Sequence, residues 1–294
     1  MGRFGSVLTA MVTPFDADGR LDPNAAGHLA RWLVDHGSDG LVVAGTTGEA
    51  PVLGDEEKLE LWRAVREAVT VPVIAGTGSN DTRHTVELTR RAAEVGADAV
   101  LVVTPYYSRP GPAGMEAHFR AAAAATSLPV LVYDIPVRTG RKVPTEVLVR
   151  LAREVDNVLG VKDAAGDPAE SARLVAEAPD SFELYSGDDA MTLPLLAIGA
   201  VGTIGVVTHW SGPQHQEMFA AFEKGDVVRA REINATLLES FAFFSGPDWP
   251  SPIPTKAMMR TLGLPVGEAR LPIGSGPPDL EDRAREVYAR LVGG

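Results

Sequence analysis

The stretch Gly54–Gly78, GDEEKLELWRAVREAVTVPVIAGTG, changes its hydrophobic pattern halfway along and thereby indicates the class of fold. In its first half, four apolar residues recur at helical spacing and would share one face: Leu59, Trp62, Val65 and Val69. Asp55 can cap such a helix, and the two glutamates after it suit the first turn. The second half, VPVIAGTG, is short, apolar and bounded by Gly, which is typical of a buried strand. The stretch therefore predicts a helix followed by a strand.

The same alternation runs through most of the chain. Eight strand-like segments can be assigned, at 6–14, 39–49, 71–78, 97–107, 128–136, 158–164, 181–189 and 200–206. Apolar strands separated by amphipathic helices indicate a parallel sheet covered on both faces, either an open doubly wound sheet or a closed (β/α)₈ barrel. Regular spacing without a break favours the TIM barrel, as does the lack of G-x-G-x-x-G after the first segment.

The last part of the chain is predicted to be helical. Helices are expected at about 214–223, 226–244, 252–262 and 279–291, with a proline-rich loop, SGPDWPSPIP, between two of them. One of these helices would complete the barrel. We therefore predict a catalytic (β/α)₈ barrel over 1–224 and a C-terminal helical extension of about three helices over 225–294, packed on the barrel.

Composition excludes several classes of function. The net charge is −12 and Lys and Arg form no cluster, which disfavours nucleic-acid binding. The chain lacks Cys, its six histidines are scattered, and no metal site is predicted. Because no apolar run is long enough to span a membrane and no signal peptide is recognisable, we expect a cytoplasmic protein with no membrane partner.

Polar side chains stand where the predicted strands end, which in such barrels is the active-site rim. They are Thr46, Thr47 and Glu49 at the end of the second segment, Tyr106 and Tyr107 at the end of the fourth, Tyr133 near the end of the fifth with Arg138 just beyond it, and Lys162 near the end of the sixth. Glu49 is interpreted as a structural carboxylate that holds its own loop. The Thr pair could hold a carboxylate, and the planar fork of Arg138 could bind one at two points. The late GTIG segment lacks a neighbouring Lys or Arg, so a non-phosphorylated substrate is predicted.

Lys162 follows an apolar strand, which is an unusual position for a hydrated cation. It could pair with Asp163 or extend to water. Alternatively, desolvation could lower its pKa enough for the neutral amine to form a Schiff base with a carbonyl substrate. Tyr133, on the preceding strand, is placed to transfer protons, with Thr46 and one of the paired tyrosines as a relay.

Five motifs in this order resemble the dihydrodipicolinate synthase / N-acetylneuraminate lyase family. They are GTTGEA (45–50), TPYYSRP (104–110), YDIPVRTG (133–140), GVKDAAGD (160–167) and YSGDD (185–189). The resemblance implies a Schiff-base lyase on a (β/α)₈ barrel. Within the family, the chain is most similar to the members that condense pyruvate with aspartate-4-semialdehyde in lysine and diaminopimelate biosynthesis.

The resemblance also assigns roles to residues. Lys162 would form the Schiff base, Tyr133 would donate and accept protons, and Thr46 and Tyr107 would complete the relay, with Tyr107 reaching in from a neighbouring subunit. Thr47 and the backbone at Gly187 and Ile204 would bind pyruvate. Arg138 would hold the carboxylate of the aldehyde. A homotetramer, a dimer of dimers, and the absence of any cofactor are implied as well.

Some residues depart from the family's pattern. Asp134 replaces a common Asn, and Asp163 replaces a common Glu. Some relatives bind inhibitory lysine at a second site, and Asn80 and Tyr106 match the residues of that site. However, His84 occupies a position where Glu is usual. Asp55 and Lys58 occupy positions where the inhibited relatives often carry His. Weak or absent inhibition by lysine is therefore predicted. Two alternatives stay open: a pyruvate-dependent aldolase or dehydratase acting on a longer 2-keto acid, and a non-catalytic barrel that binds a keto acid.

Overall fold

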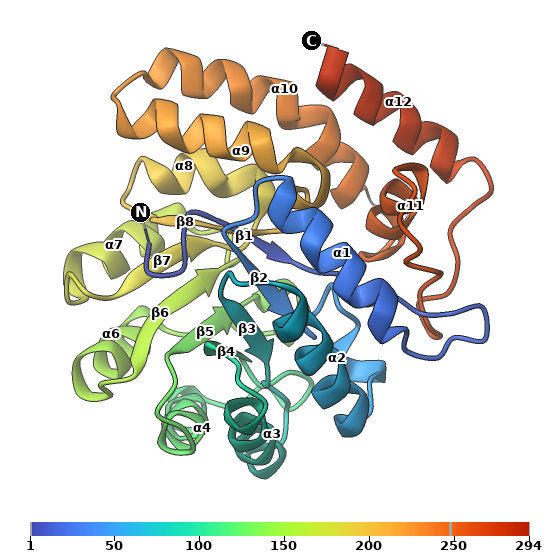
Figure 1. The fold of residues 1–294 in the computed structure, drawn as a ribbon. Helices are drawn as coiled ribbons and strands as arrows, with labels where there is room; N and C mark the ends of the chain where they lie inside the picture. The colour runs from blue at the N-terminus through green and yellow to red at the C-terminus, as the bar shows by residue number, and fades with distance from the viewer. Residues whose placement is uncertain (1, 247–248, 294) are drawn as a thin grey trace.

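The computed structural model describes residues 2–246 and 249–293 and confirms the predicted barrel. Eight strands form a closed ring in sequence order, each parallel to its neighbours (Figure 1). They are β1 (Val7–Ala10), β2 (Gly40–Val43), β3 (Val73–Gly76), β4 (Ala99–Val103), β5 (Val130–Asp134), β6 (Val158–Asp163), β7 (Glu183–Ser186) and β8 (Gly202–Gly205). All eight fall inside the predicted segments.

Helices surround the ring. The longer ones follow every strand except β7, which is followed by the short α8. They are α1 (Pro23–Asp35), α2 (Asp55–Ala68), α3 (Thr82–Glu94), α4 (Pro112–Ala124), α6 (Thr145–Glu154), α7 (Pro168–Glu177) and α9 (Thr208–Glu223). Short turns of helix that the sequence did not indicate lie in the loops: η1 (Ala50–Val52), α5 (Pro136–Thr139), η2 (Asp189–Met191) and α8 (Thr192–Leu196). The described helices are each too short or too polar to cross a membrane.

The start of α2 corrects the expectation that Asp55 caps it. The cap is Gly54, and Asp55 is the first helical residue. Glu57 accepts a hydrogen bond from the Gly54 backbone N–H at 2.9 Å, which satisfies a donor at the helix start. A carboxylate reaching back from the first turn therefore replaces the predicted cap.

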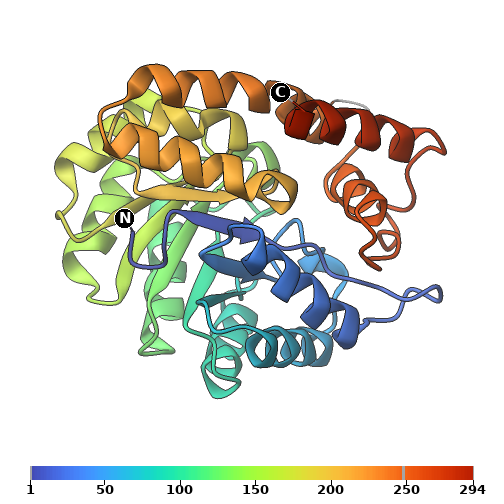
Figure 2. The same ribbon diagram turned by 45° about the horizontal axis from the view of Figure 1, so that its top comes forward.

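Three helices extend beyond the barrel: α10 (Val227–Ser245), α11 (Ile253–Thr261) and α12 (Leu280–Gly293). α10 packs along α9, and α12 packs on α10 and α11. In Figure 2 they run in orange and red along one side of the barrel. Their bounds agree with the predicted ones to within two residues, and the division into two units at residue 224 stays a prediction.

The barrel has two apolar layers because strand side chains alternate between its faces. The inner layer includes Leu8, Val42, Ile74, Leu131, Tyr133 and Ile204. The outer layer, between strands and helices, includes Val43, Val100, Val132 and Val161. A residue's position along a strand therefore decides whether it faces the barrel axis or the helices.

An irregularity in β6 sets which residues meet. Val130 pairs with Val158, but Leu131 pairs with Gly160, so the pairing skips Leu159. Beyond this point Tyr133 is the register partner of Lys162, and Asp134 that of Asp163. Gly160 fits because a Cβ there would lie 2.5 Å from the Glu183 carbonyl oxygen. The skipped residue thus brings the predicted lysine and tyrosine side by side.

Candidate active site

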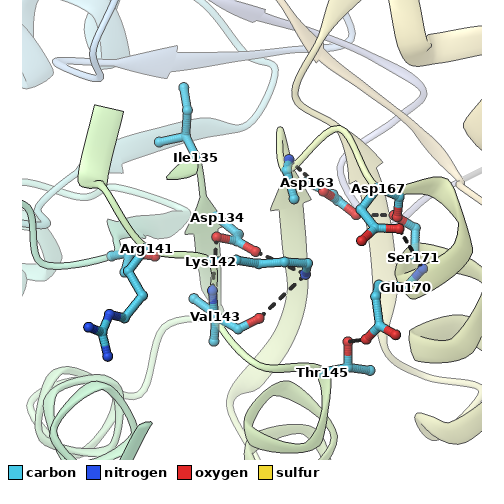
Figure 3. Close-up of polar contacts among 12 residues, drawn as sticks. Asp134, Ile135, Arg141, Lys142, Val143, Thr145, Asp163, Asp167, Glu170 and Ser171 are labelled. Atoms are coloured by element: carbon cyan, nitrogen blue, oxygen red, sulfur yellow. Dashed lines mark hydrogen bonds and ion pairs between the residues drawn. The ribbon is translucent and has the colours of Figure 1, made fainter. Parts of the chain in front are cut away.

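Lys162 and Tyr133 meet inside the mouth of the barrel. Both are almost fully buried, at 4% and 5% exposure, and the Lys162 Nζ lies 4.4 Å from the centre of the Tyr133 ring. The alternative pairing of Lys162 with Asp163 is wrong. The Asp163 carboxylate faces the helices, where it accepts hydrogen bonds from the Ser171 hydroxyl and the Ala165 N–H (Figure 3).

Burial sets the protonation of this pair. Desolvation lowers the pKa of Lys162 to about 8, and the charge of Arg138 acts in the same direction. Desolvation raises the pKa of Tyr133 to about 12, while Arg138 and a hydrogen bond with Thr46 oppose that rise. At neutral pH the site therefore holds a protonated phenol beside an amine that readily loses its proton. That is the combination that carbinolamine formation and dehydration require.

The pKa of Lys162 predicts how adduct formation depends on pH. Only the neutral amine attacks a carbonyl, and its fraction grows about tenfold per pH unit below the pKa. Addition of pyruvate should therefore accelerate from pH 6 to about pH 8 and level off above it. Quenched-flow trapping with borohydride, followed by mass spectrometry of the adduct, measures this rate. A rate that is already constant between pH 6 and 7, or one still rising above pH 10, would contradict the lowered pKa.

Asp189 is a neighbour of Lys162 to which the sequence analysis gave no role. It is 3% exposed, and its negative charge raises the pKa of Lys162 against the effect of burial. Its carboxylate accepts hydrogen bonds of 3.0–3.1 Å from the N–H groups of Val206 and Val207. Gly205 leaves the space for it, because a Cβ there would lie 2.5 Å from Asp189 Oδ1. The sequence feature that could have indicated it is the pair Asp188 and Asp189. The pair closes the predicted strand segment 181–189, whose end lies at the same rim of the barrel as Lys162.

The loop that carries Thr46 and Thr47 is held by the C-terminal extension. Glu49 ends this loop in the left-handed conformation (φ 59°), with its carboxylate fully buried. Glu49 Oε1 lies 2.8 Å from Lys256 Nζ of α11, and Oε2 accepts a hydrogen bond from the Arg270 N–H. Glu49 is structural, as predicted, but it ties the loop to a distant segment rather than to itself.

Six of the predicted site residues line one cavity of about 550 Å³. They are Thr46, Thr47, Tyr133, Arg138, Lys162 and Gly187. The Gly187 N–H donates to the Asp163 carbonyl at 2.7 Å, so its carbonyl is the backbone group left for a ligand. Phe244 and Trp249 line the same cavity. Local pattern places Trp249 in a loop and Phe244 in a helix, and it does not indicate that either residue lines the site.

Two predicted residues lie apart from this cavity wall. Ile204 is fully buried in the inner layer on β8, two residues before Val206, which does line the cavity. Tyr107 is 92% exposed and adopts a left-handed backbone (φ 68°). It lines an adjacent cavity of about 620 Å³ that shares Thr46, Tyr133 and Arg138 with the first. The roles proposed for both residues stay predictions.

The adjacent cavity is also lined by residues at the positions where some relatives are expected to bind inhibitory lysine. Asn80, Tyr106, His84 and Lys58 line it. His84 Nε2 lies 2.9 Å from Asp55 Oδ1, and burial lowers the pKa of Lys58.

Within residues 2–246 and 249–293, no cluster of three or more His, Asp or Glu side chains could hold a metal ion.

Known proteins resemble this chain along its whole length. The 4-hydroxy-tetrahydrodipicolinate synthase of Acidothermus cellulolyticus is 52% identical over 290 residues, which cover 98% of this chain and 90% of that protein. The enzyme of the same name from Moorella thermoacetica is 49% identical over 274 residues, 92% of each chain. The crystal structure of the Cyanidioschyzon merolae enzyme with lysine bound superposes with a TM-score of 0.96, at 40% identity and 99% coverage of both chains. Because the model of the dihydrodipicolinate synthetase family also matches residues 3–289, the chain belongs to that family.

Proposed function

We propose that the chain is a 4-hydroxy-tetrahydrodipicolinate synthase, a lyase that condenses pyruvate with aspartate-4-semialdehyde through a Schiff base on Lys162. The names of its relatives support this activity. The observation that carries it is the buried amine of Lys162 beside the protonated phenol of Tyr133, in a cavity that also holds Arg138.

The reaction follows from these groups. The neutral amine of Lys162 attacks the keto carbon of pyruvate, and the carbinolamine loses water after its hydroxyl takes a proton from Tyr133. The Tyr133 phenolate then takes a proton from the methyl group to give an enamine. The enamine carbon attacks the aldehyde of the second substrate, and the alkoxide that forms takes the proton back from Tyr133. The amino group of that substrate finally displaces Lys162 at the imine carbon, which closes the ring and frees the enzyme. Thr46 would hold the phenol in place throughout.

Pyruvate and the aldehyde place different demands on the cavity. Thr47 and the backbone at Gly187 and Ile204 are proposed to bind pyruvate, with the Thr47 hydroxyl as a donor to its carboxylate. Arg138 lines both cavities and is proposed to bind the carboxylate of the aldehyde. No cofactor is needed for this route, because the lysine itself withdraws electrons from the keto carbon once the imine forms.

We also propose that the chain acts as a cytoplasmic homotetramer, a dimer of dimers. The 92% exposure of Tyr107, a residue assigned to the proton relay, supports this, because an exposed tyrosine would serve the site of an adjoining subunit.

We further propose that lysine inhibits the enzyme weakly or not at all. The contact between His84 and Asp55 supports that proposal, since it occupies side chains that line or flank the adjacent cavity.

Incubation with pyruvate and borohydride tests the proposed chemistry directly. We expect reduction to fix one pyruvate on Lys162, which peptide mapping by mass spectrometry would locate. Condensation with aspartate-4-semialdehyde should follow when the aldehyde is added. An adduct-forming protein that turns over longer 2-keto acids but not the semialdehyde would indicate the related aldolase or dehydratase. An unmodified Lys162 would leave only a non-catalytic binding barrel.

Arg138→Ala is expected to lower kcat/KM for the aldehyde roughly 10- to 100-fold, which corresponds to the loss of charge-assisted hydrogen bonds of about 1.5–3 kcal/mol. Borohydride trapping of pyruvate should persist, because Lys162 remains. Steady-state kinetics with each substrate varied in turn measure the difference. Arg141→Ala is the matched control, since that side chain lies in the same loop but points away from Asp134 and Lys142 in Figure 3. Turnover that is indifferent to Arg138→Ala would count against the synthase.

A further inference from the structure

Asp134 follows Tyr133 directly and faces the other side of the strand. It is 1% exposed, and it holds two groups from further along the chain (Figure 3). Asp134 Oδ1 accepts a hydrogen bond from the Val143 N–H at 3.1 Å, and Oδ2 lies 3.3 Å from Lys142 Nζ. The Lys142 ammonium also donates to the Val143 carbonyl at 3.4 Å. The side chain of Asp134 thus reaches across nine residues of sequence.

The segment enclosed by this contact carries Arg138. It contains the single helical turn α5 and leaves it through Gly140, whose left-handed backbone (φ 76°) reverses the chain. The Thr139 hydroxyl lies 3.1 Å from the Ile135 carbonyl and 3.0 Å from the Arg141 carbonyl, which draws the two ends of the turn together. Arg138 itself is exposed, so its position depends on how firmly the backbone of this loop is held.

The positive charge of Lys142 stabilises the ionised carboxylate of Asp134. Asp134 is the register partner of Asp163, and the repulsion between the two carboxylates adds to the cost of burying Asp134. Asp163 has its own donors, Ser171 and the Ala165 N–H. Lys142, 29% exposed in its side chain, is the cation beside Asp134. Without it, the ionised carboxylate would be left buried next to a like charge, and its hold on Val143 would weaken.

We propose that Asp134 and Lys142 are a positioning pair, which closes the loop between them and thereby fixes Arg138 for the carboxylate of the second substrate. This inference rests on the proposed function of Arg138. It adds a determinant of substrate affinity that never touches the substrate. The pair also explains why Asp replaces the common Asn at position 134. An aspartate is suited to this chain because Lys142 supplies a cation beside it.

The test compares Lys142→Met with Arg141→Met, which makes the same replacement one residue earlier, at a side chain that points away from Asp134 (Figure 3). For Lys142→Met we expect the KM for aspartate-4-semialdehyde to rise about five- to tenfold, as for the loss of one charge-assisted contact. The KM for pyruvate and the rate of borohydride trapping should stay within twofold. Arg141→Met should leave all three values within twofold.

A double-mutant cycle identifies the pair. Asp134→Asn keeps an oxygen for the Val143 N–H and removes the charge that Lys142 neutralises. If the two residues act together, Asp134→Asn combined with Lys142→Met should be less impaired than the product of the single effects. Multiplicative effects would overturn the pairing.

Hydrogen exchange of the peptide that spans 135–143 tests the loop without relying on activity. Lys142→Met should speed exchange in that peptide alone, and Arg141→Met should not. Unchanged exchange would overturn the proposal whatever the enzyme does. Faster exchange with an unchanged KM for the aldehyde would overturn the positioning role. A wild-type protein that traps pyruvate but never consumes the aldehyde would instead overturn the proposed function, and the assignment of Arg138 with it.

Discussion

Lys162→Ala should abolish the borohydride-trapped pyruvate adduct and lower turnover on the order of 10⁴-fold or more. Losses of this size are expected when a covalent nucleophile is removed, because the remaining groups act only through it. The phenol of Tyr133 would then have no carbinolamine to protonate. Whole-protein mass spectrometry after reduction and a coupled turnover assay measure the two effects. Lys224→Ala, at an exposed lysine after α9, should behave as wild type.

The fold should survive this replacement. Removing Lys162 relieves the cost of burying its amine. Buried Asp189 loses the favourable charge of Lys162 but keeps its hydrogen bonds from the N–H groups of Val206 and Val207, which lower its pKa more than Lys162 does. Circular dichroism and the melting temperature should therefore stay near wild type. An adduct that persists in Lys162→Ala, on another lysine, would remove the basis of the proposed chemistry.

Lys256→Met is expected to destabilise the protein by about 3–5 kcal/mol, which is typical when one partner of a buried ion pair is removed. The Lys256 and Glu49 side chains are 1% and 0% exposed, so Glu49 would keep a buried charge without its cation. Lys256 also donates to the Glu268 carbonyl at 2.9 Å and lies 4.2 Å from the centre of the Phe15 ring. At about 2–4 °C per kcal/mol, the melting temperature should fall by roughly 10 °C.

Two further variants separate this effect from general damage. Lys224→Met makes the same replacement at an exposed position and should melt with the wild type. Glu49→Gln combined with Lys256→Met removes both charges and should recover much of the lost stability, because no ion is left unpaired. If Lys256→Met alone melts within 2 °C of wild type, the ion pair does not anchor the loop of Thr46 and Thr47 to the C-terminal helices.

Much of this architecture could be predicted from the sequence because it depends on local patterns. Strands and helices alternate with clear periodicities, as in Gly54–Gly78, and the barrel follows from their number and spacing. Lys162 and Tyr133 could be placed together because both end consecutive strands. Such inferences need only the order of elements and the rule that strand ends share a rim.

Other features depend on contacts between distant segments, which periodicity does not report. Asp189 meets backbone N–H groups seventeen and eighteen residues later, and Glu49 meets Lys256 from the far end of the chain. Phe244 on α10 and Trp249 beyond it line the cavity although both come long after the last strand of the barrel. The cap of α2 differed from expectation for a local reason, since Glu57 accepts the hydrogen bond from the Gly54 N–H and Asp55 lies within the helix.

The skipped residue in β6 ties function to chain length. Since Leu159 has no partner on β5, the pairing after it is offset by one residue, and this offset keeps Tyr133 and Lys162 on the same face of the sheet. A deletion of one residue between Val130 and Tyr133 in β5 would turn Tyr133 toward the helices, even with every catalytic side chain still encoded. Within β5 a gap of one residue is therefore equivalent to an active-site mutation, whereas loss of the unpaired Leu159 from β6 would leave the pairing of Tyr133 with Lys162 unchanged.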